Sequence, residues 1–249
     1  MSPQWGEQYR YAHLYSQPLP TERKSFLRPI LLGLFVLLML VGIVWFAFYG
    51  PGFNSLFQAK DAPTVSDRAV TLDLAGQRFV IPENYLRRSD HRKSGEVKQI
   101  EIHALLPNLT GFSESNAEEF ADKTNNSRVV YITLTAPKRI MRPAERFHQI
   151  YPYYFAGPER QGDYGLRLRN MDENSGFSDF DILYNQLGNQ FYLYHCLKPQ
   201  NDLMPSDCLA DHVVEPKILA RYRFRRAALE NWQQLDANMA KLLENFAGR

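Results

Sequence analysis

A long, uninterrupted apolar run is the strongest hydrophobic pattern in this chain. The twenty residues Ile30–Tyr49 carry no charge, and none occurs anywhere from Pro29 to Ala59. Because a helix rises about 1.5 Å per residue, such a run reaches roughly 30 Å, the thickness of the hydrocarbon layer of a bilayer. A buried helix of a soluble protein rarely runs this long without a polar residue. We therefore predict one transmembrane helix within residues 29–50.

The outer end of this run favours an anchor over a cleaved signal peptide. The apolar core of a signal peptide is about 7–15 residues long and ends in small residues. This run is longer, and its end is bulky: Trp45, Phe46, Phe48 and Tyr49. Trp and Tyr are enriched where a helix meets the lipid headgroups. The pattern is that of a signal-anchor.

Flanking positive charges predict the orientation of the anchor. Those before the run are Arg10, Arg23, Lys24 and Arg28, whereas the first after it is Lys60. Lys and Arg are retained on the cytoplasmic side. We expect residues 1–28 to be a disordered cytoplasmic tail, 51–67 a linker and 68–249 a single extracytoplasmic domain. Nothing targets an organelle, so a Gram-negative inner membrane with the domain in the periplasm is the expected location.

Short alternating segments in the domain predict strands. They are 69–74, 77–81, 97–105, 128–136, 165–169, 179–185, 190–197 and 218–225. Each alternates apolar with polar residues or is rich in β-branched and aromatic ones. Ala75-Gly76 and the segment 186–189 have the composition of hairpin turns. These features predict a mainly antiparallel sheet.

Helix signals complete the predicted fold. Ser115 and Glu118 fit a capping box ahead of a short helix, and Pro143 fits the first turn of a second one. Residues 227–246 carry one apolar stripe at three- and four-residue steps, which predicts an amphipathic C-terminal helix. The stripe packs on the sheet or recruits a partner helix, and we expect packing. The fold class is therefore α+β, preceded by one transmembrane helix.

Two cysteines, Cys196 and Cys208, lie in the outer domain. Outside the cytoplasm such a pair commonly forms a disulfide bond. The alternative is a zinc site with His195 and His212. Adjacent residues of a strand point to opposite faces, so His195 and Cys196 do not share a metal readily. We predict the disulfide bond and no metal or cofactor.

Charge balance argues against nucleic acid as a partner. Four of the 29 Lys and Arg residues and two of the 27 Asp and Glu residues lie in residues 1–59, which leaves 25 of each sign in residues 60–249. Binding to phosphates requires a net basic surface. A neutral domain favours other partners.

No catalytic motif is present in the sequence. It lacks a nucleophile elbow, a zinc-protease helix motif, a phosphate-binding loop and a dinucleotide-binding loop. The favoured function is therefore protein interaction or an accessory role in envelope assembly, secretion or immunity. The rival is a membrane-anchored enzyme, most plausibly a hydrolase. Its candidate residues are His103, Glu145, His148 and Asp163.

Three surface segments are candidates for binding. The first is aromatic: Phe147, Tyr151, Tyr153, Tyr154 and Phe155. It is a protein interface if exposed and closes the core if buried. The other two are basic: Arg87, Arg88, Arg92 and Lys93, then Lys138, Arg139, Arg142 and Arg146. They contact lipid headgroups or an acidic partner, or they are ordinary solvated loops.

Overall fold

The computed structural model of the protein describes residues 27–49, 62–199 and 205–248. These fall into two units, Met1–Gln58 and Ala59–Arg249. The predicted cytoplasmic tail and much of the predicted linker lie outside the described residues. The first unit contains helix α1, Leu27–Tyr49, which coincides with the apolar run. Within the described part of the chain, no helix is found that is long and apolar enough to cross a membrane. The membrane anchor stays a prediction from the sequence.

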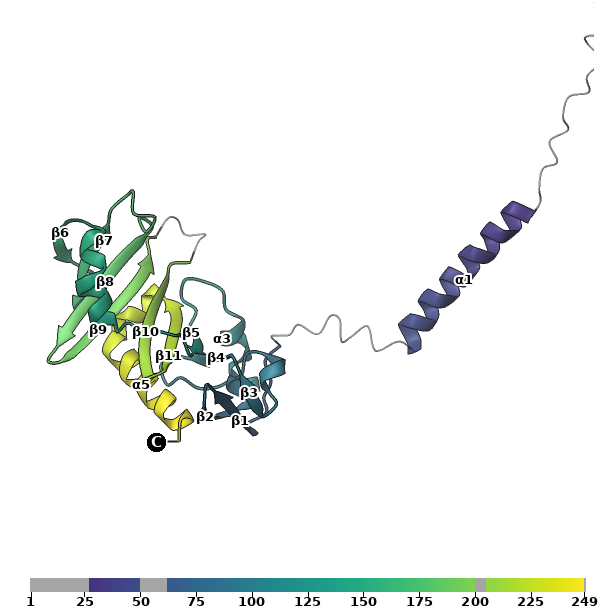
Figure 1. The fold of residues 1–249 in the computed structure, drawn as a ribbon, viewed down its shortest axis with the longest axis horizontal. Helices are drawn as coiled ribbons and strands as arrows, with labels where there is room; N and C mark the ends of the chain where they lie inside the picture. The colour runs from purple at the N-terminus through teal and green to yellow at the C-terminus, as the bar shows by residue number, and fades with distance from the viewer. Residues whose placement is uncertain (1–26, 50–61, 200–204, 249) are drawn as a thin grey trace, which may run out of the picture. The chain divides into compact units, whose positions relative to one another are not determined.

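An eight-stranded sheet forms the centre of the second unit (Figure 1). Its order is β4-β5-β11-β10-β9-β8-β7-β6, and neighbouring strands run antiparallel, as predicted. The strands are β4 (Gln99–Leu105), β5 (Val129–Thr135), β6 (Phe155–Gln161), β7 (Arg167–Met171), β8 (Phe180–Leu187), β9 (Gln190–Leu197), β10 (Asp207–Glu215) and β11 (Ile218–Arg225). The sequence patterns do not indicate β6 or β10. The first contains Gly157 and Pro158, and the second places acidic and small residues where an apolar period would stand.

A smaller sheet has the order β2-β1-β3. Its strands are β1 (Ala69–Leu74), β2 (Gln77–Pro82) and β3 (Gly95–Val97). The predicted hairpin of β1 and β2 is confirmed. Both residues of its turn have positive φ, 54° at Ala75 and 86° at Gly76, the backbone that a tight two-residue hairpin requires. β3 lies parallel to β1.

Short helices connect the strands. The α-helices of this unit are α3 (Ala117–Ala121), α4 (Pro143–Gln149) and α5 (Trp232–Phe246). The 3-10 helices are η1 (Glu83–Tyr85), η2 (Ser89–His91), η3 (Glu114–Asn116), η4 (Tyr151–Tyr153), η5 (Asp163–Gly165) and η6 (Arg226–Asn231). The predicted capping box at Ser115 is wrong: Ser113 and Asn116 cap the first turn instead. The C-terminal helix is correct in kind, but residues 226–231 form a 3-10 turn ahead of it.

The C-terminal helix packs on the sheet, as the stripe predicts. Its buried residues are Trp232, Leu235, Met239, Leu243 and Phe246. They belong to the main hydrophobic core with both sheets. Figure 1 shows α5, in yellow, beside β10 and β11 and ending near β1 and β2. Burial of each large apolar side chain contributes about 1.5–3 kcal/mol, so α5 covers this inner face firmly.

In the described residues, one hydrophobic cluster packs at each side of the opposite, outer face of the large sheet. On β8 and β9, Ile182 and Leu193 pack with Phe147 of α4, while their neighbours Leu183 and Tyr194 point into the main core. Since successive side chains alternate between faces, α4 and α5 lie on opposite faces. At the other side, Phe120 of α3 packs on Leu105 and Val129. Between these clusters, the outer side chains of β11 and β10 carry charges.

Candidate functional site

Cross-strand register places charged side chains along the middle of the outer face. One row of directly opposed residues runs Tyr131, Arg223, Leu209, His195 and Ile182, from β5 across to β8. Directly opposed residues share a face. The next row continues with Thr133, Arg221 and Asp211. The alternation of arginine with apolar residues on β11, noted in the sequence, therefore positions Arg221 and Arg223 on the outer face.

The pairing between β9 and β10 is short. Only two opposed pairs are found there among the described residues, Cys208 with Cys196 and Leu209 with His195. A disulfide bond joins the first pair. This confirms the predicted bond and excludes a zinc site built from the two thiolates. Beyond Leu209, β10 continues without a partner on that side, and Asp211 lies where the pairing has stopped.

Asp211 is a buried carboxylate held by two arginines. Arg221 donates from Nε to Oδ1 at 2.8 Å and from Nη2 to Oδ2 at 3.1 Å. Arg146, from α4, donates to Oδ2 at 2.6 Å. The side chain of Asp211 is only 5% exposed. Burial raises its pKa, but the hydrogen bonds from Arg221 and Arg146 outweigh burial and leave the pKa below its usual value.

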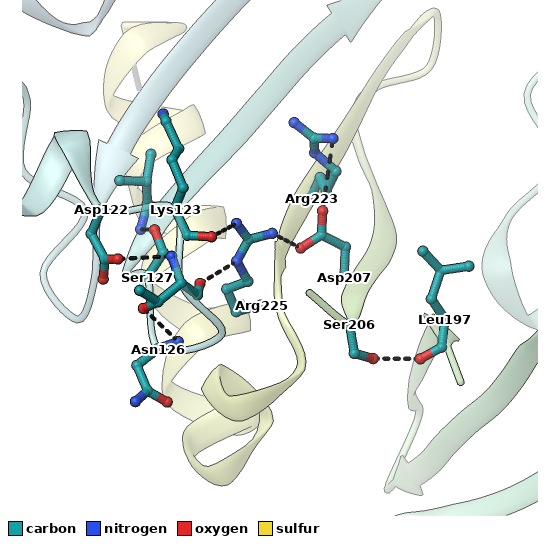
Figure 2. Close-up of polar contacts among 11 residues, drawn as sticks. Asp122, Lys123, Asn126, Ser127, Leu197, Ser206, Asp207, Arg223 and Arg225 are labelled. Carbon is teal, nitrogen blue, oxygen red and sulfur yellow. Dashed lines mark hydrogen bonds and ion pairs between the residues drawn. The ribbon is translucent and has the colours of Figure 1, made fainter. Parts of the chain in front are cut away.

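Asp207 forms a second cluster of the same kind four residues earlier on β10 (Figure 2). It pairs with Arg225 and, at 3.7 Å, with Arg223. Arg225 also donates to the backbone oxygens of Thr124 at 2.9 Å and Lys123 at 3.0 Å. Figure 2 shows this guanidinium between the loop after α3 and β10. Arg225 therefore joins the loop after α3 to β10. It lies at one edge of the middle part of the outer face, on β10 and β11, which we call the open strip.

Two adjoining pockets lie on the outer face around Asp211. The first has a volume of about 320 Å³ and is lined by Tyr151, His195 and apolar residues: Met171, Phe177, Phe180, Ile182 and Leu209. The second, of about 480 Å³, is lined by residues that include Thr133, Arg139, Ile140, Met141 and Leu219. Both pockets share Arg146, Asp211 and Arg221. We call the two together the Arg221 groove.

A neutral histidine lies at one end of the groove. Burial, reinforced by Arg146, lowers the pKa of His195 to about 4. Its Nε2 is hydrogen-bonded to the hydroxyl of Tyr151, whose pKa is raised by burial. Neither group changes charge near neutral pH. The charge of the groove therefore comes from its arginines and Asp211.

The predicted aromatic segment is divided between core and surface. Phe147 of α4 and Tyr151 of η4 are buried, and Phe155 is half-buried beside them. Tyr154 is 37% exposed and Tyr153 is 85% exposed. Of this segment, Tyr151 lines the groove, Phe147 and Phe155 pack beneath it, and Tyr153 is exposed.

The residues proposed for a hydrolase lie in separate surroundings. His103 is buried against Phe120, and burial lowers its pKa to about 4. His148 contacts the ring of Phe191. The other two have local roles: Glu145 accepts a hydrogen bond from the backbone of Arg142, and Asp163 pairs with Arg226. The structure brings no catalytic group together from this set.

The two predicted basic clusters differ in their contacts: residues of the first make local contacts, and residues of the second line the groove. In the first, Arg88 pairs with Asp90, and Arg92 donates to the backbone of Leu86. In the second, Arg139 and Arg146 line the Arg221 groove. Sequence reasoning missed Asp207 and Asp211 because β10 was not predicted. The available signal was an acidic residue at every fourth position, opposite a strand with an arginine at every second.

A third pocket, of about 300 Å³, is lined mainly by apolar and amide side chains. Its lining includes Leu106, Pro107, Ala228, Asn231 and Leu235. The side chain of Arg128 at its edge pairs with Glu119. Within residues 27–49, 62–199 and 205–248, no group of His, Cys, Asp or Glu is placed to hold a metal ion. This pocket offers little polar chemistry, unlike the Arg221 groove.

The structure defines an α+β domain with an antiparallel sheet and a C-terminal helix, and similar folds exist among solved structures. No known protein family matches the chain, and no curated protein matches its sequence. One similar structure is Smlt3025, an immunity protein of the Stenotrophomonas maltophilia type IV secretion system. It has a TM-score of 0.51 and 13% identity, over 73% of this chain and 94% of that one. Another is FrpD, an iron-regulated outer membrane lipoprotein of Neisseria meningitidis. It has a TM-score of 0.50 and 13% identity, over 78% of this chain and 98% of that one. At this identity, the likeness concerns the fold.

Proposed function

We propose that this chain is a membrane-anchored protein-interaction module of the envelope-assembly, secretion or immunity type. The domain at residues 68–249 faces the periplasm and binds a protein partner through the Arg221 groove. The observation that carries the proposal is the open strip of the large sheet. Helices cover both sides of this face, yet its middle strands present recessed apolar surface beside paired charges. A concave surface of this composition is typical of a binding site.

The similar folds support this proposal. Smlt3025 is an immunity protein of a secretion system, and FrpD is an outer membrane lipoprotein. Both are envelope or secretion-related proteins, which fits a role outside the cytoplasm. The charge asymmetry about the apolar run supports an inner-membrane anchor with a cytoplasmic N-terminus. The disulfide bond supports an oxidising compartment.

Photo-crosslinking in intact cells tests the proposed function. A photoreactive phenylalanine replaces Thr133 or Phe177 at the groove, Tyr153 near its wall, or Val80 on the small sheet. The last three are exposed. We expect a crosslinked protein of the envelope from at least one position. Absence of any adduct from all four positions, with each variant expressed and folded, would refute a role in protein binding.

Limited proteolysis tests the location. Protease added to spheroplasts should digest the domain at residues 68–249 and spare an epitope tag placed before residue 28. Digestion of the tag with protection of the domain would reverse the proposed orientation.

A further inference from the structure

We infer that the Arg221 groove recognises an acidic segment of its protein partner. In this arrangement, carboxylates of the partner bind Arg221 and Arg223, and an apolar side chain enters the pocket beside Phe177 and Phe180. The inference rests on the proposed function and adds the chemistry of the partner. It follows from the balance, exposure and rigidity of the charges on the outer face.

Around β10 and β11, the outer face carries four arginines paired with two aspartates. Asp207 lies between Arg223 and Arg225, and Asp211 between Arg146 and Arg221. Each carboxylate carries one negative charge against two positive ones. Residues 60–249 as a whole carry 25 charges of each sign, so this excess is local. Such a patch attracts negative charge and orients a partner that carries it.

The four arginines divide into two buried and two accessible ones. The side chains of Arg146 and Arg225 are 19% and 16% exposed, and they hold the two aspartates. Those of Arg221 and Arg223 are 53% and 49% exposed. Arg221 donates to Asp211 from Nε and Nη2. Its third nitrogen, Nη1, takes no part in these two bonds. A carboxylate suits such a planar guanidinium because it accepts two parallel hydrogen bonds.

Arg223 is held in place by an aromatic ring. Its guanidinium carbon lies 5.0 Å from the centre of the Tyr131 ring, within the range of a cation–π contact. Arg221 is likewise fixed by its two bonds to Asp211. Ligands bind more tightly to groups that are already ordered, because less conformational entropy is lost. The pair is therefore preorganised for an incoming anion.

The apolar pocket beside these arginines adds a second requirement for the partner, an apolar side chain next to its carboxylates. Met171, Phe180 and Ile182 line it, and Tyr151 and His195 close its polar end. Because His195 has its pKa lowered to about 4, it stays neutral, and an apolar group that covers it does not have to desolvate a charge. A single aliphatic or aromatic side chain of the partner fits this volume. A few side chains that fill well-packed pockets supply most of the affinity in protein interfaces.

The recessed position of the groove favours a protein segment over a lipid surface. Asp211 and Arg146 are only 5% and 19% exposed, so a flat layer of headgroups would not reach the floor. A peptide segment presents single side chains, one of which can occupy the pocket lined by Arg146 of α4 and Leu209 of β10. The acidic partner therefore needs an accessible loop or terminus.

Peptide binding to the full chain in detergent micelles tests the inference. The probe is a peptide of alternating Glu and Leu with a neutral dye, and its control replaces every Glu with Lys. We expect the Glu peptide to bind and the Lys peptide to bind at least about tenfold more weakly. Raising NaCl from about 50 mM to about 500 mM should weaken the Glu peptide by about tenfold, because salt screens exposed charges. Absence of binding by the Glu peptide, or equal binding of both peptides, would overturn the inference.

Three variants locate the binding. The double variant Arg221→Gln with Arg223→Gln should weaken the Glu peptide by at least about tenfold. Arg139→Glu changes only an exposed side chain at the groove, so it tests the same charge effect without disturbing Asp211; we expect about fivefold weakening. Arg78→Glu, an exposed arginine on β2, is the matched control and should change affinity less than about twofold. Unchanged binding in Arg139→Glu and in a folded double variant would refute the site.

Two further outcomes separate the inference from the proposed function. Phosphatidylglycerol added to the micelles should not displace the Glu peptide; displacement would assign the groove to lipid headgroups. In cells, crosslinks from Val80 without crosslinks from Thr133 or Phe177 would overturn the inference and leave the interaction role intact. Crosslinks from the groove to a partner segment that lacks acidic residues would do the same.

Discussion

Removal of the disulfide bond should destabilise the domain by about 3 kcal/mol. Cys196 and Cys208 are separated by 12 positions. In the chain-entropy model, closing a loop of this length removes about 10 cal/mol/K from the unfolded chain, which is about 3 kcal/mol at 25 °C. Both cysteines are fully buried, so replacement by alanine adds a small packing loss. The total approaches half of the stability of a typical domain.

The loss of stability should be concentrated near the disulfide bond, because the bond lies where two neighbouring strands of the large sheet share few opposed residue pairs. β9 and β10 share two opposed residue pairs, and one of these is the disulfide pair. The remaining pair, Leu209 with His195, lines the groove. Loss of the bond should therefore raise amide hydrogen exchange at Leu209 and His195 more than at the long pairing of β8 with β9.

Urea unfolding of three variants tests this reasoning: Cys196→Ala, Cys208→Ala and the double variant. Each single variant already breaks the bond, so all three should lose about the same free energy of unfolding, roughly 3 kcal/mol. Chemical reduction of the unchanged chain should produce a similar loss. Additive losses in the double variant, or a loss below about 1 kcal/mol on reduction, would refute the loop-closure account.

Two other stability predictions follow from buried ionisable groups. His103 and His195 have pKa values lowered to about 4 by burial, against about 6.5 when unfolded; stability should hold above pH 6.5 and fall by about 2 kcal/mol per histidine by pH 5, because only the unfolded chain gains the protons. Urea midpoints that stay constant between pH 7 and pH 5 would contradict this. Asp211→Asn should cost about 3 kcal/mol because it leaves Arg146 without its buried counter-charge. The matched change Asp163→Asn, at a carboxylate whose side chain is 51% exposed and paired with Arg226, should cost less than about 1 kcal/mol by the same measurement.

Local signals in the sequence predict most elements of the domain. Strands with a buried alternation, such as β5 and β11, and the striped helix α5 follow directly from the spacing of apolar residues. The disulfide bond is equally local, since its cysteines stand close together in the chain. The predicted helix start at Ala227 fails because residues 226–231 continue as a 3-10 turn, in which Arg226 pairs with Asp163 and Asp181. That pairing is tertiary and leaves no mark on the local pattern.

The groove shows why the site is harder to predict than the fold. On β11 the arginines at every second position are visible in the sequence, and this alternation places them on one face of the strand. Their partners on β10 are not, because Asp207 and Asp211 interrupt the apolar pattern of a strand with its outer face open. The same charged outer face that places β10 in the proposed site therefore hides the strand from pattern analysis. A register search would recover it: pairing around Pro216-Lys217 sets Asp211 opposite Arg221 and Asp207 opposite Arg225.

Arg146 marks the limit of such reasoning. It lies 65 positions before Asp211 in the chain. Its side chain reaches β10 because its neighbours Phe147 and Tyr151 pack on the outer face of the sheet. The sequence shows a basic cluster at residues 138–146 but no reason for one of its members to be buried. Its contact with Asp211 joins the aromatic segment, the basic cluster and the arginine strand in one site. Two candidate surfaces that are separate in the sequence, the aromatic segment and the second basic cluster, thus meet the arginine strand at the groove, and this convergence makes it the first place to look for the partner.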